Sequence, residues 1–156
     1  IINCTRFRSK NKKETISDFE KTFNIEVKNY FFFLEELLKK NNTKKISILN
    51  ISSTNATLVS HQFFSYHISK NLIETLTKYF SIHLAKDNIR VNSVSPGGVF
   101  NEQGHDFVKN YSRRVPLNRM ANKNEIPGTI LYLANNSLSS YVTGQNIAVD
   151  GGLSSW

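Results

Sequence analysis

A tyrosine and a lysine four residues apart form the pair in this sequence that is best suited to chemistry. Tyr66 and Lys70 belong to the run S-Y-H-I-S-K, and residues at this spacing share one face of a helix. An ammonium beside a phenol favours the phenolate, so such a pair could give or take a proton near neutral pH. Most pairs at this spacing are solvated surface contacts, however, so the spacing alone leaves both interpretations open.

A serine at the end of an apolar run supplies a hydroxyl for the same chemistry. Ser53 follows the run at residues 46–51, which predicts a buried strand. Open α/β sheets build their sites at the carboxyl ends of their strands. Ser53 is therefore placed where a substrate oxygen could be held.

The helices that position these residues are indicated by capping signals and apolar periodicity. A capping box at residues 17–20, beginning with Ser17, predicts the start of one helix. A second helix is expected to carry Tyr66 and to end at Asp87 and Asn88, and a third is capped by residues 122–125. One apolar stripe follows the first cap and predicts a buried helix face; it consists of Phe19, Phe23, Val27, Tyr30, Leu34, Leu37 and Leu38.

The expected strands define the fold class. Apolar runs at residues 46–51, 89–94 and 147–149 predict strands, and residues 1–4 predict the end of another. Strands that alternate with helices are typical of α/β proteins with a parallel sheet and flanking helices. We expect residues 1–156 to form a single domain of this class.

Composition excludes several functional classes. The 156 residues include 39% hydrophobic residues, so the chain can bury a core. The single cysteine, Cys4, permits no internal disulfide, and the scattered histidines indicate no metal site, so we expect a reducing cytoplasm. No apolar run approaches the ~20 residues of a membrane span, and no secretory leader is visible. The net charge of +8 favours solvated faces over nucleic acid, because the lysine clusters at residues 10–13, 39–40 and 44–45 lack interleaved aromatic residues.

Four segments in this order resemble the short-chain dehydrogenase/reductase family. They are N-I-S-S at 50–53, Y-H-I-S-K at 66–70, R-V-N-S-V-S-P-G-G at 90–98 and Y-V-T-G-Q-N-I-A-V-D-G-G at 141–152. The resemblance implies a Rossmann-like, doubly wound parallel sheet and hydride transfer between a nicotinamide and a carbonyl or secondary alcohol. It covers the second part of a usual member, so we expect the N-terminal strands to lie outside these residues.

The resemblance also assigns roles. It implies that Tyr66 exchanges the hydroxyl proton, that Lys70 favours the phenolate and holds the nicotinamide ribose, and that Ser53 orients the substrate oxygen. It implies backbone contacts from the turn at residues 96–99 to the nicotinamide carboxamide, although a Gly pair after a strand is often only a turn. The implied cofactor-binding residues are Asn3, Tyr66, Lys70, Pro96, Gly97, Gly98 and Val99.

Three positions depart from the family pattern. Residues 3–6 stand where relatives carry Asn-Asn-Ala-Gly, and only Asn3 matches, so Arg6 takes the place of the Gly. Glu26 aligns with a helix Asn whose backbone carbonyl holds a water in the proton relay to the lysine. An anion there would strengthen the hold of Lys70 on its proton and alter the pH profile. Asn101 replaces a Thr near the nicotinamide turn and can also donate and accept hydrogen bonds.

The expected lid, residues 104–118, favours a polar or anionic substrate, such as a sugar or a phosphorylated intermediate, over a sterol or a long acyl chain. Its polar residues include His105, Asp106, Lys109, Arg113 and Arg114. The P-G-G-V-F form of the turn resembles members from bacterial surface-sugar pathways. The alternative is a 3-oxoacyl-carrier-protein reductase, whose acidic carrier would suit a chain of charge +8.

These residues contain no T-G-x-x-x-G-x-G turn, which receives the pyrophosphate in relatives. The cofactor is therefore expected to be NAD or NADP without a choice between them. One interpretation is the second half of an active enzyme, with a small polar substrate and a homo-oligomeric assembly. The other is a truncated, non-catalytic protein that acts by subunit association.

Overall fold

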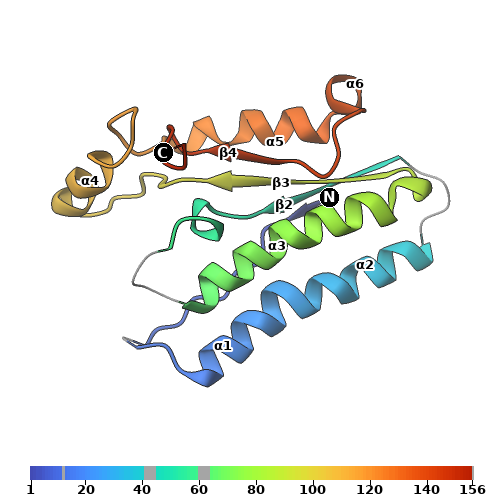
Figure 1. Cartoon of the computed structure of the whole chain (residues 1–156), viewed down its shortest axis with the longest axis horizontal. Coiled ribbons are helices and arrows are strands. Elements are labelled where there is room, and N and C mark those ends of the chain that lie inside the picture. Colours follow the sequence, from blue (N-terminus) through green and yellow to red (C-terminus); the bar gives the residue numbers. More distant parts are fainter. Residues whose placement is uncertain (12, 41–44, 60–63, 156) are drawn as a thin grey trace.

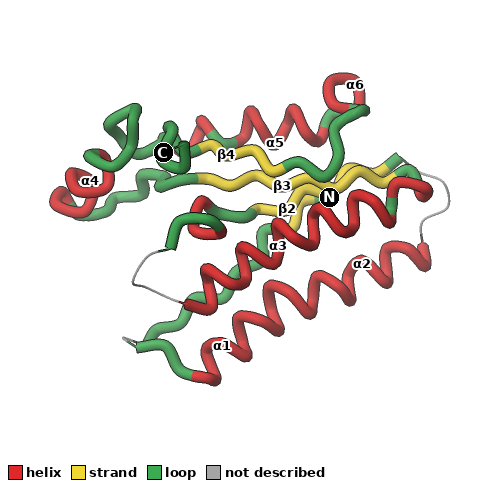
Figure 2. Tube along the Cα trace, viewed as in Figure 1, coloured by secondary structure: helices red, strands yellow, loops and turns green. Residues whose placement is uncertain are grey.

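A computed structural model describes residues 1–11, 13–40, 45–59 and 64–155. Residues 60–63 of the expected loop after Ser53, and Lys12 and Lys44 of the lysine clusters, lie outside the described residues. The chain forms a central parallel sheet with helices on both faces, as Figures 1 and 2 show. The expected Rossmann-like α/β fold is confirmed.

The sheet contains four strands in the order β1-β2-β3-β4, all parallel. Their bounds are Ile2–Asn3 for β1, Ile46–Ile51 for β2, Ile89–Pro96 for β3 and Asn146–Val149 for β4. Parallel strands that are covered on both faces consist of continuous apolar runs rather than alternating ones. Because the four strands are parallel, their carboxyl ends all lie at one edge of the sheet. At this edge Ser53 follows β2 and the turn at residues 96–99 follows β3.

Two hydrophobic cores cover the two faces of the sheet. Ile48 and its neighbour Leu49 are both almost fully buried, and they face opposite cores because side chains alternate along a strand. The first core packs α2 and α3 against one face, and the second packs α5 against the other (Figure 1). The bounds are Asn29–Lys40 for α2, Phe64–His83 for α3 and Pro127–Ala134 for α5.

The helix before α2 begins earlier than the sequence predicted. The N-cap of α1 (Ile16–Phe23) is Thr15 rather than Ser17, so the predicted boundary was wrong. The Thr15 hydroxyl accepts from the Asp18 N–H, and the Asp18 carboxylate accepts from the Thr15 N–H, which closes the capping box two residues upstream. The carboxylate also accepts from Asn11, and these hydrogen bonds hold the pKa of Asp18 well below its usual range.

A π-helical turn, Asn24–Lys28, joins α1 to α2 within one continuous helical rod. Such turns are rare and frequently mark functional sites, because the wider turn shifts the direction of the side chains that follow it. Glu26 and Val27 of this turn are both buried. The turn thus directs a carboxylate into the interior of the protein.

The predicted turns are present, but α3 ends at His83 rather than at the predicted Asp87 and Asn88. A short 3-10 turn, Ala85–Asp87, follows α3, and Asn88 in the left-handed region (φ 58°) leads into β3. Asn122 and Glu125 form the predicted capping box before α5. The other helices are α4, His105–Ser112, and α6, Asn136–Ser139. Across the described ranges, no helix combines the length and the apolar character that a membrane crossing requires.

A buried amide and a buried phenol join the first two strands to the helices. Asn50 of β2 donates to the Tyr30 hydroxyl at 3.0 Å and to the Thr77 hydroxyl at 2.9 Å, and it accepts from the Asn3 amide at 3.1 Å. Burial raises the pKa of Tyr30 to about 12 from its ordinary 10.0. The hydroxyl is therefore held neutral well into the alkaline range.

Tyr30→Phe should change the alkaline limb of the stability curve. The unfolded phenol ionises before the folded one, so the contribution of Tyr30 is complete below pH 10 and is lost as pH rises towards 12. In urea unfolding from pH 7 to 11.5, the free energy of unfolding of Tyr30→Phe should be about 1 kcal/mol below that of the wild type at pH 7, because the hydrogen bond is missing. The difference in unfolding free energy between the two proteins should then become smaller above pH 10. Tyr79→Phe, at an exposed position, is the control, and a constant gap for Tyr30→Phe would contradict the assignment.

Candidate active site

A cleft of about 490 Å³ opens at the carboxyl edge of the sheet. It is lined by Ser53 after β2, by Tyr66 in the first turn of α3, and by Gly97, Gly98 and Val99 after β3. This volume lies within the range of small-molecule sites. The structure thus brings together the two predicted hydroxyl groups and most of the predicted nicotinamide turn.

Lys70 lies on α3 with its side chain buried behind the Tyr66 ring. Its ammonium nitrogen is 5.6 Å from the ring centroid and 2.9 Å from a carboxylate oxygen of Glu26. It also donates to the carbonyls of Ile51 at 3.3 Å and of Thr5 at 3.4 Å. Three acceptors therefore surround the three N–H donors of the ammonium.

Glu26 is fully buried, and each of its two carboxylate oxygens has a partner on a different segment. One oxygen accepts from the Phe7 N–H at 2.9 Å, and the other accepts from the Ser69 hydroxyl at 3.1 Å beside Lys70. The carboxylate itself contacts the lysine, whereas the family alignment had assigned that position a role through its backbone. Glu26 thus joins the π turn, α3 and the loop after β1.

Arg6 is a site residue whose contact with Tyr66 the sequence did not predict. Its guanidinium carbon lies 4.5 Å from the centroid of the Tyr66 ring, which is cation–π distance. The Glu26 hydrogen bond to the next residue, Phe7, holds this loop in place. The available signal was the replacement by Arg of the Gly that relatives carry, and only the fold shows that this side chain reaches the phenol.

The turn after β3 has fewer free backbone groups than the resemblance implied. The Gly97 N–H donates to Val149, and the Gly98 carbonyl accepts from Ala121 at 2.9 Å. The Gly98 N–H donates to the hydroxyl of Tyr111 in α4. A Cβ on Gly98 would lie 2.5 Å from the Tyr111 ring carbon that bears the hydroxyl, so only glycine allows this close approach. Burial raises the pKa of Tyr111.

Of the other predicted residues, Ser53 lines the cleft, whereas Asn3 and Pro96 do not. Asn3 uses its amide on Asn50 and on Thr5, which steadies β1 against β2. Pro96 ends β3 and pairs with Val149 of β4. Ser53 faces the cleft and accepts from the Asn55 N–H at 3.2 Å. Cofactor contacts by Asn3 and Pro96 remain predictions.

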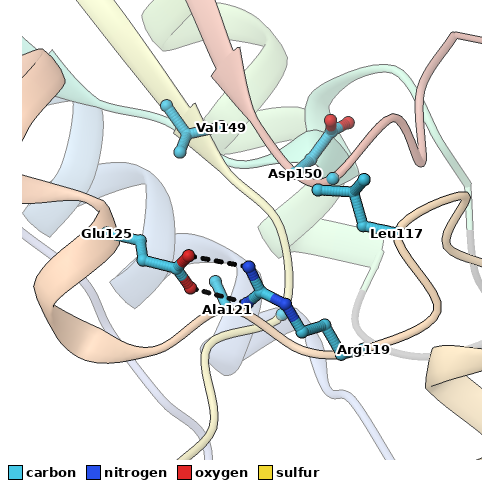
Figure 3. Close-up of a pocket in the computed structure, with 8 residues that line it drawn as sticks. Leu117, Arg119, Ala121, Glu125, Val149 and Asp150 are labelled. Carbon is cyan, nitrogen blue, oxygen red and sulfur yellow. Dashed lines mark hydrogen bonds and ion pairs between the residues drawn. The ribbon is translucent and has the colours of Figure 1, made fainter.

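A second, smaller hollow of about 100 Å³ lies beside the cleft and is shown in Figure 3. Arg119 donates from both terminal nitrogens to the two carboxylate oxygens of Glu125, each at 2.7 Å. The guanidinium and the Asn122 N–H lower the pKa of Glu125 to about 2. The cation of this hollow is therefore neutralised within the protein. The described part of the chain gathers no group of three or more His, Cys, Asp or Glu that could hold a metal ion.

Known proteins resemble the chain throughout most of its length. Residues 4–154 match the family model described as Enoyl-(Acyl carrier protein) reductase. The chain is 38% identical to the ribulose-forming D-arabinitol 2-dehydrogenase of Candida tropicalis, over 80% of this chain and 46% of that protein. It is 33% identical to NADPH-dependent aldehyde reductase 1, chloroplastic, of Arabidopsis thaliana, over 85% of this chain and 48% of that protein. The chain spans about half the length of these relatives.

A solved structure shows the same fold. The short-chain dehydrogenase of Leptospira borgpetersenii, described with bound NAD+, superposes with a TM-score of 0.90 at 33% identity. The match covers 98% of this chain and 63% of that one. The arrangement of strands and helices described above is thus shared with that structure.

The Glu26–Lys70 contact predicts a strong energetic coupling. Glu26→Gln removes the charge with little change of shape, and the buried ammonium loses its counter-ion, which should destabilise the protein by about 3 kcal/mol. Urea unfolding of Glu26→Gln, Lys70→Met and the double variant measures the coupling. The double variant should lose much less unfolding free energy than the sum of the losses in the two single variants, because it leaves no unpaired buried charge.

Glu36→Gln provides the matched control for this cycle. Glu36 pairs with Lys39 at 2.8 Å on the surface of α2, where both side chains are exposed to solvent. Removal of this charge should lower the free energy of unfolding by no more than about 0.5 kcal/mol. Equal effects of the two glutamine variants, or simple additivity in the cycle, would show that the buried pair does not hold the site together.

Proposed function

Because the chain belongs to the short-chain dehydrogenase/reductase family, we propose that it transfers a hydride between a nicotinamide dinucleotide and a carbonyl or secondary alcohol of a polar metabolite. One observation carries the proposal. Ser53, Tyr66 and the glycine turn after β3 line a single cleft, and Lys70 stands behind Tyr66. We propose that these groups act as proton donor, orienting hydroxyl and cation beside this substrate-sized space.

In this proposal the Tyr66 hydroxyl gives or takes the proton of the substrate oxygen. Ser53 holds that oxygen with a hydrogen bond and so keeps the reacting carbon in place. The guanidinium of Arg6 and the ammonium of Lys70 lie 4.5 Å and 5.6 Å from the centroid of the Tyr66 ring, so two cations adjoin the residue that exchanges the proton. When bound, the cofactor supplies or accepts the hydride.

The residues of the cleft fit the nicotinamide end of such a cofactor. Tyr66, Gly98 and Val99 would border it, and Lys70 could exchange one of its two longer carbonyl contacts for a ribose hydroxyl. Both cofactors have support among similar proteins, since the Leptospira structure is described with NAD+ and the Arabidopsis relative is named NADPH-dependent. We therefore propose NAD or NADP.

A polar substrate has two supports. The relative from Candida tropicalis is named for a polyol, D-arabinitol. Arginines also line the cleft, although α4 turns the aromatic residues Phe107 and Tyr111 towards it. A sugar or polyol fits this mixture of charge and aromatic surface, and the P-G-G-V-F turn directs the proposal towards surface-sugar biosynthesis.

The second candidate function is reduction of a 3-oxoacyl group on acyl carrier protein. The description of the matching family model refers to this carrier, and the net charge of +8 would attract an acidic protein.

Exposed Phe31 and Phe32 on α2 support a further proposal, association into a homo-oligomer. We also propose that the protein is located in the reducing cytoplasm, and the single free cysteine, Cys4, is consistent with this location.

Tyr66→Phe should abolish most of the activity and leave cofactor binding intact. Loss of a general acid lowers carbonyl reduction by roughly 10²–10⁴-fold, and the phenyl ring preserves the packing under Arg6. Steady-state oxidation of NADH or NADPH and calorimetric binding of the same cofactor measure the two effects. Tyr79→Phe, an exposed site on the same helix, should behave as wild type. Unchanged turnover in Tyr66→Phe would remove the central claim.

A substrate panel separates the two candidate functions. We expect reduction of ketoses such as ribulose, and oxidation of the matching polyols, at higher kcat/KM than reduction of acetoacetyl thioesters. The physical reason is that the guanidinium groups at the cleft bind hydroxyl oxygens better than methylene groups. Activity on acetoacetyl thioesters with none on sugars would reverse this order.

A further inference from the structure

Three arginines line the candidate cleft, and no carboxylate accompanies them. Arg6 and Arg8 come from the loop after β1, and Arg114 comes from the turn that follows α4. Among the described residues that line the cleft, none is Asp or Glu. The cleft therefore combines three permanent positive charges with the reactive phenol of Tyr66.

Glu14 lies with Arg6 and Arg8 at a small adjoining hollow, where its carboxylate accepts from the Ser65 N–H at 3.1 Å, but it forms no ion pair with either arginine. In the described ranges, ion pairs engage Lys39, Lys70, His105 and Arg119 but none of the three cleft arginines. Arg119 makes the useful comparison, because Glu125 neutralises it in the adjacent hollow (Figure 3). Like charges that converge on one space repel each other, and an anion placed among them relieves that repulsion.

The arginine loop is also held in position before any ligand arrives. Arg6 rests on the Tyr66 ring at 4.5 Å, and the buried Glu26 fixes the following residue through the Phe7 N–H. Arg114 follows α4, where its N–H donates to the Tyr111 carbonyl at 3.0 Å. The guanidinium of Arg6 is thus preorganised, and a preorganised guanidinium binds planar or tetrahedral oxyanions through paired hydrogen bonds at a low entropic cost.

We propose that the cleft recognises its substrate by an oxyanion group, a phosphate or a carboxylate, held by Arg6, Arg8 and Arg114. The carbonyl or alcohol carbon then lies beside Tyr66 and Ser53. This inference rests on the proposed function for the reaction, but the recognition of an anion is a separate property of the same cleft. The substrate class is thus an anionic ketose or polyol rather than a neutral one.

Isothermal titration of the purified protein with three ketoses tests the proposal. Ribulose, ribulose 5-phosphate and 2-ketogluconate are compared, with and without saturating NAD+, under which no reduction can occur. At least one anionic ketose should bind with a Kd roughly tenfold or more below that of ribulose, as expected for charge-assisted hydrogen bonds. The tighter of the two anions identifies the group as phosphate or carboxylate.

Substitutions then locate the binding. Arg6→Gln, Arg8→Gln and Arg114→Gln should each raise the Kd of the anionic ketose by roughly tenfold, with little change for ribulose. Arg113→Gln is the matched control, because Arg113 is an exposed neighbour that does not line the cleft. Arg6→Lys should restore part of the affinity, because it keeps the charge and loses the planar fork.

Three results would overturn the proposal. They are equal affinity for ribulose and both anionic ketoses, an effect of Arg113→Gln as large as that of Arg6→Gln, and displacement of the anionic ketose by NAD+. The last would assign the arginines to the cofactor phosphates. Arginine-dependent binding without any oxidation of NADH or NADPH would keep the anion site and refute the proposed reaction. Turnover of neutral ketoses without any preference for anionic ones would support the proposed reaction and refute the anion site.

Discussion

The site depends on one buried ion pair, between Glu26 and Lys70. A buried ammonium without a counter-ion is costly, so the carboxylate must be brought to it, and the π turn between α1 and α2 does this. The same carboxylate accepts from Phe7 and Ser69. One side chain therefore sets the relative positions of two helices and of the loop that borders the cleft.

The distribution of charge in the site follows from this pair. Lys70 pairs with Glu26 inside the protein, whereas Arg6 forms no ion pair among the described residues and lies over the Tyr66 ring. The cation that faces the cleft is thus a guanidinium, which is planar and suited to oxyanions. Arg6 stands at a position for which the family resemblance implies Gly, and its side chain lines the cleft.

The parallel sheet supplies the frame in which these contacts meet. Ser53 and the turn after β3 follow neighbouring strands, so their backbones emerge at the same edge. Helix α4 closes on that turn through Tyr111, whose hydroxyl accepts from the Gly98 N–H. The glycine at this position is explained by the contact, because any larger residue would displace the aromatic ring.

The sequence by itself determined the features that depend on neighbours in the chain. Apolar runs identified the strands, Asn122 and Glu125 identified a capping box, and the spacing of Tyr66 and Lys70 placed them on one helix. Local signals were insufficient at the first helix, where the Thr15–Asp18 hydrogen bonds moved the cap upstream of Ser17.

Only the tertiary structure decided which distant groups meet. Glu26 and Lys70 lie on separate helices, and Arg6 reaches Tyr66 from a third segment. The sequence placed Glu26 near the lysine by family alignment, and it showed that Arg6 was unusual. The carboxylate contact itself, the guanidinium over the phenol and the inward-facing residues of α4 result from packing across the sheet edge. Long-range packing and burial set these contacts, and residue spacing does not encode them.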